Sequence, residues 1–279
     1  MQRNLFSKYF FLFIQGVAFL TMPITLEAKA DQPNVIFILT DDLGYGDLGV
    51  LFQKQREGVQ LKTPELDQMA EEGTIMNRHY CPAPMCAPSR ASLITGLHQG
   101  HSNVRNMQFD KAIEDNWNFA NTLKKAGYHT IHLGKYGLQG WGNSPEKWAG
   151  YPTKRGFDYF YGYVRHVDGH QHYPANVWEL GDNKSHQQKK EVWENNKEVS
   201  AGLDKCYTTD LWTAKAKQLI VAETKENPKR PFFMFLSYDT PHAALQLPTI
   251  AYPKGKGIKG GLQFVEFVGV ARCQIDRLH

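Results

Sequence analysis

The apolar positions of the chain form two kinds of run, which predict strands alternating with helices. Unbroken runs of β-branched and aromatic residues are typical of strands in a buried parallel sheet, and they predict strands over 34–40, 128–135 and 231–239. We expect the first of these strands to be buried on both faces. Helical spacing of the apolar positions predicts helices over 63–73, 116–127 and 209–224. This alternation indicates an α/β fold, with a largely parallel central sheet flanked by helices.

Local signals mark the ends of the predicted helices. The helix over 63–73 has Thr63 at its N-cap and Pro64 at its first position, and its expected apolar face holds Leu66, Met69 and Ala70. Thr and Pro favour these two positions because the first helical N–H groups have no partner within the helix. Gly73 and Gly127 are expected to end the first two helices.

Polar residues follow the predicted strands where each strand ends. Asp41 and Asp42 follow the first strand, Lys135 closes the second, and His242 comes shortly after the last. Ligands of parallel sheets bind at the carboxyl ends of the strands, so we expect these side chains to share one site. The segment 137–200, rich in aromatic, glycine and polar residues, is expected to be a long insertion that lines a pocket and has little regular structure.

The first thirty residues have the pattern of a secretory signal peptide. Arg3 and Lys8 form a positive region, 9–20 is apolar but short for a membrane span, and 28–30 reads Ala-Lys-Ala, a cleavage site. The alternative is an N-terminal membrane anchor. Cleavage after Ala30 would place the chain in the periplasm or outside the cell, without stable membrane insertion.

Composition and charge narrow the class of protein. The hydrophobic content of 42 % and the charged content of 22 % are ordinary for a globular protein. Loss of the leader removes three positive charges and one negative charge, which lowers the net charge from +4 to +2. So small a charge gives no reason to expect nucleic-acid binding. Four cysteines in 279 residues are too few for a disulfide scaffold, and they are Cys81, Cys86, Cys206 and Cys273.

Two stretches carry candidate chemistry. Asp41 and Asp42 are adjacent carboxylates, which repel each other unless a cation lies between them, so they suggest a hard divalent metal; the alternative is a solvated turn. In Cys-Ala-Pro-Ser-Arg (86–90), Pro88 fits the start of a helix that runs to Gly96. Cys86 would then lie at the positive end of the helix dipole, one turn from Arg90. The alternative is a structural cysteine in front of an ordinary helix.

Several motifs in a fixed order resemble those of the type I sulfatases, in the alkaline phosphatase superfamily. The Cys-x-Pro-Ser-Arg motif with its following Ala-Ser-Leu-Ile-Thr-Gly is similar to the family's signature. Further resemblance covers 34–49, 132–140, 155–163 and 232–248. The likeness extends from Asn34 to at least His242 and implies an alkaline phosphatase-like fold.

The resemblance implies a covalent modification and a metal. Cys86 would be converted to formylglycine by a formylglycine-generating enzyme, and the hydrated aldehyde would attack the sulfur of a sulfate ester. The metal would be held by Asp41, Asp42 and residue 86, and would be calcium, with magnesium as the alternative. Arg90 would orient the diol and Lys135 would neutralise the sulfate.

Histidines complete the site that the resemblance implies. His242 would bind sulfate or protonate the leaving oxygen. His170 lies where many relatives place a histidine that contacts substrate, and His172 is a weaker candidate for the same role. Many sulfatases also have a histidine two residues after the active-site lysine, but this chain has Gly137 there.

The C-terminal part departs from the family pattern. We expect a signal peptide over 1–30, the N-terminal part of a sulfatase catalytic domain over 31–252, and a divergent, frame-shifted tail over 253–279. The C-terminal part of the family fold, with further metal ligands and a lysine, would then be missing, and activity would be weak or absent.

The function expected from the whole pattern is hydrolysis of sulfate monoesters, on a sulfated glycan or a small aryl sulfate. Two alternatives remain open. One is a phosphonate or phosphate ester hydrolase of the same superfamily, and the other is a protein that binds sulfated glycans without cleaving them. Relative rates on aryl sulfate and aryl phosphonate would separate the enzymes.

Overall fold

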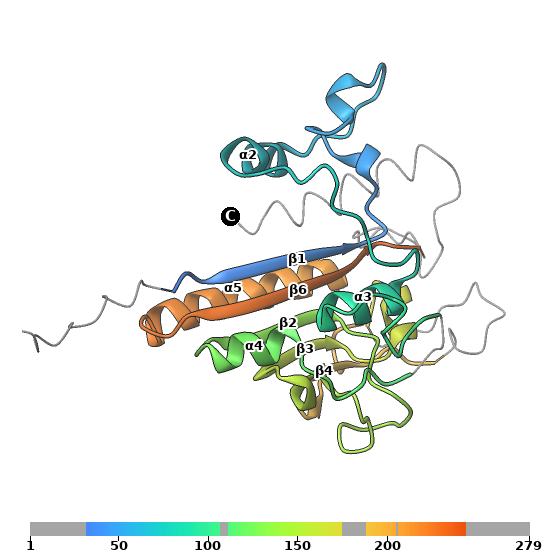
Figure 1. Ribbon diagram of the computed structural model, residues 1–279, viewed down its shortest axis with the longest axis vertical. Coiled ribbons are helices and arrows are strands. Elements are labelled where there is room, and N and C mark those ends of the chain that lie inside the picture. Colours follow the sequence, from blue (N-terminus) through green and yellow to red (C-terminus); the bar gives the residue numbers. More distant parts are fainter. Residues whose placement is uncertain (1–31, 107–110, 175–187, 205, 244–279) are drawn as a thin grey trace, which may run out of the picture. The chain divides into compact units, whose positions relative to one another are not determined.

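A computed structural model describes residues 32–106, 111–174, 188–204 and 206–243 (Figure 1). The strands are β1 (Val35–Asp41), β2 (His129–Lys135), β3 (Tyr159–Tyr163), β4 (Val192–Glu194), β5 (Lys197–Glu198) and β6 (Phe232–Pro241). The α-helices are α2 (Pro64–Glu72), α3 (Cys86–Thr95), α4 (Phe119–Lys125) and α5 (Thr208–Glu226). Short 3-10 helices are η1 (Tyr45–Asp47), η2 (Gln53–Gln55), η3 (Pro152–Arg155) and η4 (His166–His170).

The six strands form one sheet in the order β1-β6-β2-β3-β4-β5. The pairs β1–β6, β6–β2 and β2–β3 are parallel, whereas β3–β4 and β4–β5 are antiparallel. Ile131 of β2 lies opposite Met234 of β6 on one side and Tyr159 of β3 on the other. The expected α/β fold with a largely parallel central sheet is confirmed.

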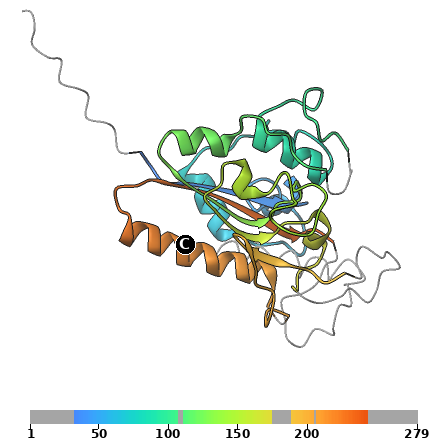
Figure 2. The same cartoon turned by 90° about the horizontal axis from the view of Figure 1, so that it is seen from below.

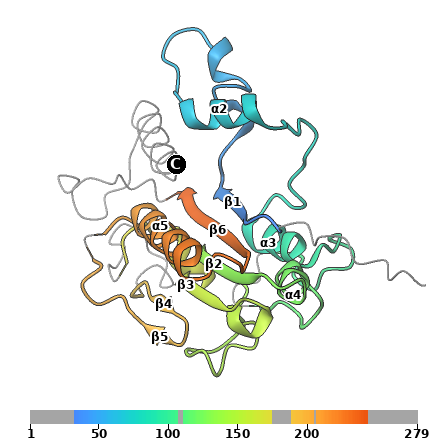
Figure 3. The same ribbon diagram turned by 90° about the vertical axis from the view of Figure 1, so that its left-hand side faces the viewer.

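Helices cover both faces of the sheet, because successive side chains of a strand point to opposite faces. Ile131, Leu133 and Met234 pack with Trp212 of α5 in one buried cluster. Phe233 and Phe235, which alternate with Met234, pack with α3 and α4 in a second cluster. In Figure 2 α5 lies on one side of the strands, with α3 and α4 on the other, and Figure 3 shows β6 between β1 and β2.

Two expectations about strands were wrong. β1 was expected to be buried on both faces, but it is the edge strand of the sheet among the described residues, and Ile36 and Phe37 are 43 % and 38 % exposed. The segment 137–200 was expected to have little regular structure, but it supplies β3, β4 and β5. Its many aromatic residues are explained by core packing, since Phe160 and Tyr163 are fully buried in the sheet.

The predicted helices form, with shifted starts. α4 begins at Phe119 rather than near 116, because the Asn118 side chain accepts a hydrogen bond from the Asn121 N–H at 3.0 Å and caps the helix there. α3 begins at Cys86 itself, with Met85 as N-cap, and ends at Gly96 in the left-handed region.

The helix α2 has the predicted ends, and Leu66 of its predicted apolar face packs, partly buried, against the cluster around Trp212, but no residue of that face is fully buried. Thr63 is its N-cap and Gly73 its C-cap, as the sequence indicated. Its buried residue is Asp67, while Met69 is exposed. The Asp67 carboxylate accepts hydrogen bonds from the Val50 N–H at 2.8 Å and the Thr63 hydroxyl at 3.0 Å, so polar contacts with the preceding loop fix this helix.

Other expectations lie outside the described residues. The leader over 1–30 and the tail over 253–279 belong to this group. Among the helices of the described segments, none has the length and hydropathy needed to cross a bilayer.

Candidate active site

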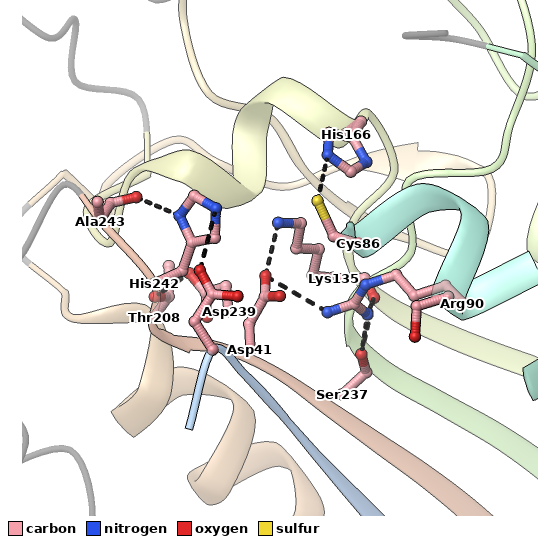
Figure 4. A network of polar contacts seen from close by, with 12 residues as sticks. Asp41, Cys86, Arg90, Lys135, His166, Thr208, Ser237, Asp239, His242 and Ala243 are labelled. Carbon is pink, nitrogen blue, oxygen red and sulfur yellow. Dashed lines mark hydrogen bonds and ion pairs between the residues drawn. The ribbon is translucent and has the colours of Figure 1, made fainter. Parts of the chain in front are cut away.

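The polar residues predicted at strand ends meet at the carboxyl edge of the parallel strands. Asp41 ends β1, Lys135 ends β2, and His242 follows β6 directly. Parallel strands place these ends at one edge of the sheet. Figure 4 shows the side chains that converge there, joined by Cys86 and Arg90 of α3.

Asp41 is held by two buried cations. Its Oδ2 lies 2.6 Å from Nζ of Lys135 and 3.5 Å from Nη2 of Arg90. Burial by itself would raise the pKa of the Asp41 carboxyl, but Lys135 and Arg90 together outweigh burial and hold this pKa well below its usual value. The cluster therefore carries two positive charges and one negative charge, and the excess positive charge favours an anionic ligand.

Arg90 is anchored to the sheet as well as to Asp41. Its Nη1 donates to the backbone oxygen of Lys135 at 2.7 Å and to the hydroxyl of Ser237. Ser237 donates to the same backbone oxygen at 2.9 Å. Arg90 is almost fully buried, so these bonds fix the guanidinium at the carboxyl end of β2. Ser237 has a supporting role that the sequence did not indicate.

Cys86 lies at the first position of α3 and faces a group of histidines. Its Sγ is 2.9 Å from Nε2 of His166. One ligand atom from each of Cys86, His170 and His242 lies within 4.8 Å of the others. Cys86, His170 and His242, each named from the sequence as a site residue, therefore lie close together, and His166 is an additional residue that sequence reasoning missed.

His170 and His242 stack on each other. Their ring centroids are 4.7 Å apart and the ring planes differ by 6°. Burial lowers the pKa of both imidazoles, and the positive charge of Lys135 lowers it further. Both rings are thus neutral at physiological pH, and each offers one donor and one acceptor nitrogen.

Asp239 and His172 fix the backbone at His242. Asp239 is fully buried and accepts hydrogen bonds from the Thr208 hydroxyl at 2.7 Å and from Nε1 of Trp212 at 2.8 Å. His172 Nδ1 lies 3.0 Å from Oδ2 of Asp239, and its Nε2 lies 2.9 Å from the backbone oxygen of His242. His172, a candidate for substrate contact, is instead a buried link between these two residues.

Asp42 differs from its neighbour Asp41. Its side chain is 68 % exposed, and its Oδ2 lies 3.7 Å from Nε2 of His242. Asp42 has a φ of 66°, in the left-handed region that Asp tolerates better than most residues. The sharp change of backbone direction at Asp42 separates the two carboxylates into one buried group and one solvent-facing group.

A family profile and two relatives that this chain matches are all named as sulfatases. Residues 33–258 match the profile of the family described as Sulfatase. The chain is 31 % identical to arylsulfatase J of Mus musculus, over 79 % of this chain and 34 % of that protein. It is 32 % identical to N-acetylgalactosamine-6-sulfatase of Mus musculus, over 78 % of this chain and 42 % of that protein. The chain thus spans less than half the length of these two relatives.

A solved structure has the same arrangement of elements. The crystal structure of Ps i-CgsB is 28 % identical and matches with a TM-score of 0.66, over 88 % of this chain and 53 % of that one. The same protein in complex with k-i-k-neocarrahexaose matches with a TM-score of 0.65 at 27 % identity, again over 88 % of this chain and 53 % of that one.

Proposed function

Because the chain belongs to the sulfatase family, we propose that it hydrolyses sulfate monoesters, with residue 86 as the source of the nucleophile. The observation that supports this most directly is the position of Cys86. It begins a helix at the carboxyl edge of the sheet, close to His170 and His242. The helix N-terminus and the excess positive charge around Asp41 both favour an anion there.

We propose that Cys86 is converted to formylglycine by a formylglycine-generating enzyme. Sγ of the unconverted residue then stands for the oxygen of the hydrated aldehyde. One hydroxyl of this hydrate attacks sulfur and forms an S–O bond while the bond to the alcohol breaks, and the alcohol takes a proton. Loss of the second hydroxyl's proton then forms the carbonyl and expels sulfate, and water restores the hydrate.

The chain's own residues would supply charge and protons. Lys135 and Arg90 would balance the negative charge of the sulfate, and Arg90 would also orient the hydrate. His242 would donate a hydrogen bond from its N–H to the sulfate or to the leaving oxygen. It could pass a proton to that oxygen only after becoming an imidazolium ion, because a neutral imidazole is a very weak acid. His170, stacked on His242, would bind the sulfate.

Two carboxylates at this edge are of the donor type that a hard divalent cation needs, although the ligand atoms that lie within 4.8 Å of one another are those of Cys86, His170 and His242. The carboxylates of Asp41 and Asp42, with the oxygen of converted residue 86, are the oxygen ligands that calcium prefers, and magnesium is the alternative. Lys135 already bonds to Oδ2 of Asp41, so an ion would share this carboxylate with the lysine. When bound, the ion would lower the pKa of the attacking hydroxyl and polarise the sulfuryl group.

The substrate class we propose is a sulfated carbohydrate. Two observations support it: one relative is named for sulfate on N-acetylgalactosamine, and Ps i-CgsB was crystallised with a neocarrahexaose. We also propose that the protein acts in the periplasm or outside the cell, on the basis of the leader-like pattern in residues 1–30.

The test combines modification and activity. The chain is produced with a formylglycine-generating enzyme, and the mass of the peptide around residue 86 is measured. Conversion removes one sulfur and two hydrogens and adds one oxygen, so the mass of the peptide falls. Thiol oxidation only adds oxygen, so it raises the mass. Hydrolysis of an aryl sulfate should require conversion and be absent from Cys86→Ser and Cys86→Ala, which cannot be converted. A converted chain that cleaves aryl phosphonate faster, or binds sulfated oligosaccharide without cleaving it, would contradict the proposal.

A further inference from the structure

The imidazole of His166 occupies the space that a side chain at position 137 would fill. A Cβ added to Gly137 would lie 2.7 Å from Nδ1 of His166 and 3.4 Å from its Cα. Gly137 also has a φ of +74°, which disfavours other residues there. The absence of a side chain at 137 therefore leaves room at the end of β2 for a ring that comes from η4.

A second glycine, in η4, leaves room for a side chain that comes from the end of β2. A Cβ added to Gly169 of η4 would lie 2.4 Å from Cδ of Lys135. Thus Lys135 of the β2 end lies against a glycine of η4, and His166 of η4 lies against a glycine just after β2. This reciprocal packing lets η4 lie directly on the carboxyl end of β2.

Polar contacts hold η4 in this place. Nε of Arg165 lies 2.9 Å from Oδ2 of Asp168, which is fully buried. Arg165 also donates through Nη2 to the backbone oxygen of Lys189 at 2.7 Å. On the other side, the N–H of Gly137 donates to the backbone oxygen of Val164 at 3.0 Å. His166 is therefore attached to a segment that is fixed on both sides.

The fixed ring points at residue 86. Nε2 of His166 lies 2.9 Å from Sγ of Cys86, and His166 is only 1 % exposed. Figure 4 shows the ring above the thiol, on the side away from Asp41. The side chain of residue 86 can rotate among three staggered positions about its Cα–Cβ bond, and a hydrogen bond from a fixed ring would favour one of them.

We infer that His166 is a positioning residue, which orients the oxygen on residue 86 through a hydrogen bond, and that Gly137 is required because it leaves space for this imidazole. The catalytic part of this inference rests on the proposed sulfatase function. The geometric part does not, because it concerns any polar atom at residue 86. A purely structural role, in which the ring only fills space, is the competing explanation.

A spectroscopic experiment tests the geometric part without activity or conversion. The full chain is labelled with ¹⁵N-histidine, and the His166 ring signals are assigned by their loss in His166→Gln. Cys86→Ser keeps a hydroxyl at residue 86, and Cys86→Ala removes the polar atom. We expect the Nε2 signal of His166 to differ between these two variants, and the difference to shrink when Gly137→Ala displaces the ring. Equal Nε2 signals in Cys86→Ser and Cys86→Ala would overturn the inference.

A kinetic experiment in the converted chain tests the catalytic part. His166→Leu fills the space without a hydrogen bond, and we expect kcat to fall about fivefold to tenfold, the size expected for one lost hydrogen bond, with KM nearly unchanged. His166→Gln, which can still bond, should retain more of kcat. A His166→Leu variant with the kcat of the unsubstituted chain would overturn the catalytic role.

A matched glycine variant controls for backbone strain. Gly137→Ala should lower kcat as His166→Leu does, and should have little further effect in the His166→Leu background. Gly202 also has a positive φ, +80°, but a Cβ there would meet nothing within 4 Å, so Gly202→Ala should leave kcat unchanged. If the unsubstituted converted chain hydrolyses no sulfate ester, the proposed function fails, while the histidine spectra still decide whether His166 contacts residue 86.

Discussion

Nζ of Lys135 lies 2.6 Å from Oδ2 of Asp41, although their strands are not neighbours. β6 lies between β1 and β2, so the lysine reaches across one whole strand to the carboxylate. Both side chains are buried, and Arg90 lies on the same carboxylate oxygen. One aspartate thus balances two buried cations. Removal of its charge should therefore destabilise the cluster more than removal of either cation.

Asp41→Asn should destabilise the chain more than Lys135→Met. The first change leaves two buried cations without an anion, which costs about 3–5 kcal/mol, whereas the second leaves the Arg90–Asp41 pair and costs about 1–3 kcal/mol. Urea unfolding at neutral pH, without divalent ions, measures both. The double variant should be more stable than Asp41→Asn alone, because it removes one of the two unbalanced cations. Additive losses would contradict this account of the cluster.

Asp42→Asn should weaken calcium binding and leave the stability of the metal-free chain nearly unchanged. The Asp42 side chain is 68 % exposed, so its charge contributes little to folding, and Asn also tolerates its left-handed backbone. Calcium at about 100 times its Kd should stabilise the unsubstituted chain by about 2.7 kcal/mol. Thermal unfolding with and without calcium should show a much smaller gain for Asp42→Asn. Equal gains would exclude Asp42 as a ligand.

Pro88→Ala should reduce conversion of Cys86 without unfolding α3, because the resemblance to sulfatases implies that the modifying enzyme recognises the proline and arginine that follow the cysteine. Pro88 is the third residue of the helix, and the first N–H bonded within it is that of Ser89, which donates to the Met85 backbone oxygen at 3.0 Å. The missing N–H of Pro88 therefore costs the helix nothing, and Ala can replace it. Peptide mass spectrometry measures conversion and circular dichroism the fold. Pro84→Ala, at an exposed position before the helix, is the control and should convert normally.

His132→Phe should make the chain less sensitive to acid. His132 is fully buried and stacks on the rings of Phe157 and Phe235, and burial, with the charge of Arg90, lowers its pKa. The unfolded chain takes up a proton at this residue below about pH 6.5 and the folded chain does not, so stability falls as the pH drops, by up to about 1.4 kcal/mol per pH unit. At pH 5 the variant should be more stable by about 2 kcal/mol, and at pH 8 the two should be similar.

The control for this experiment is His79→Gln, because His79 is exposed. This variant should keep the full acid sensitivity of the unsubstituted chain. Urea unfolding at pH 5, 6, 7 and 8 gives the four free energies needed for each protein. If the stability of His132→Phe fell with acid as steeply as that of the control, His132 would not be the source of the effect.

The sequence by itself determined the elements that depend on local signals. Apolar periodicity and capping residues predicted α2 and α5, and apolar runs predicted β2 and β6, close to their observed ends. Order along the chain then placed Asp41, Lys135 and His242 at one edge of the sheet, since parallel strands align their carboxyl ends. The ordered motifs also identified the family, because each motif is a short contiguous stretch that can be recognised from its residues alone.

Only the tertiary structure decided what depends on contacts between distant segments. An apolar run looks the same in a central strand and at an edge, so the exposure of Ile36 and Phe37 on β1 was not predictable. The difference between Asp41 and Asp42 arises where Lys135 and Arg90 reach one carboxylate and not the other. The contact of His166 with residue 86 joins positions eighty residues apart. No local sequence pattern predicts which ring fills the space next to Gly137.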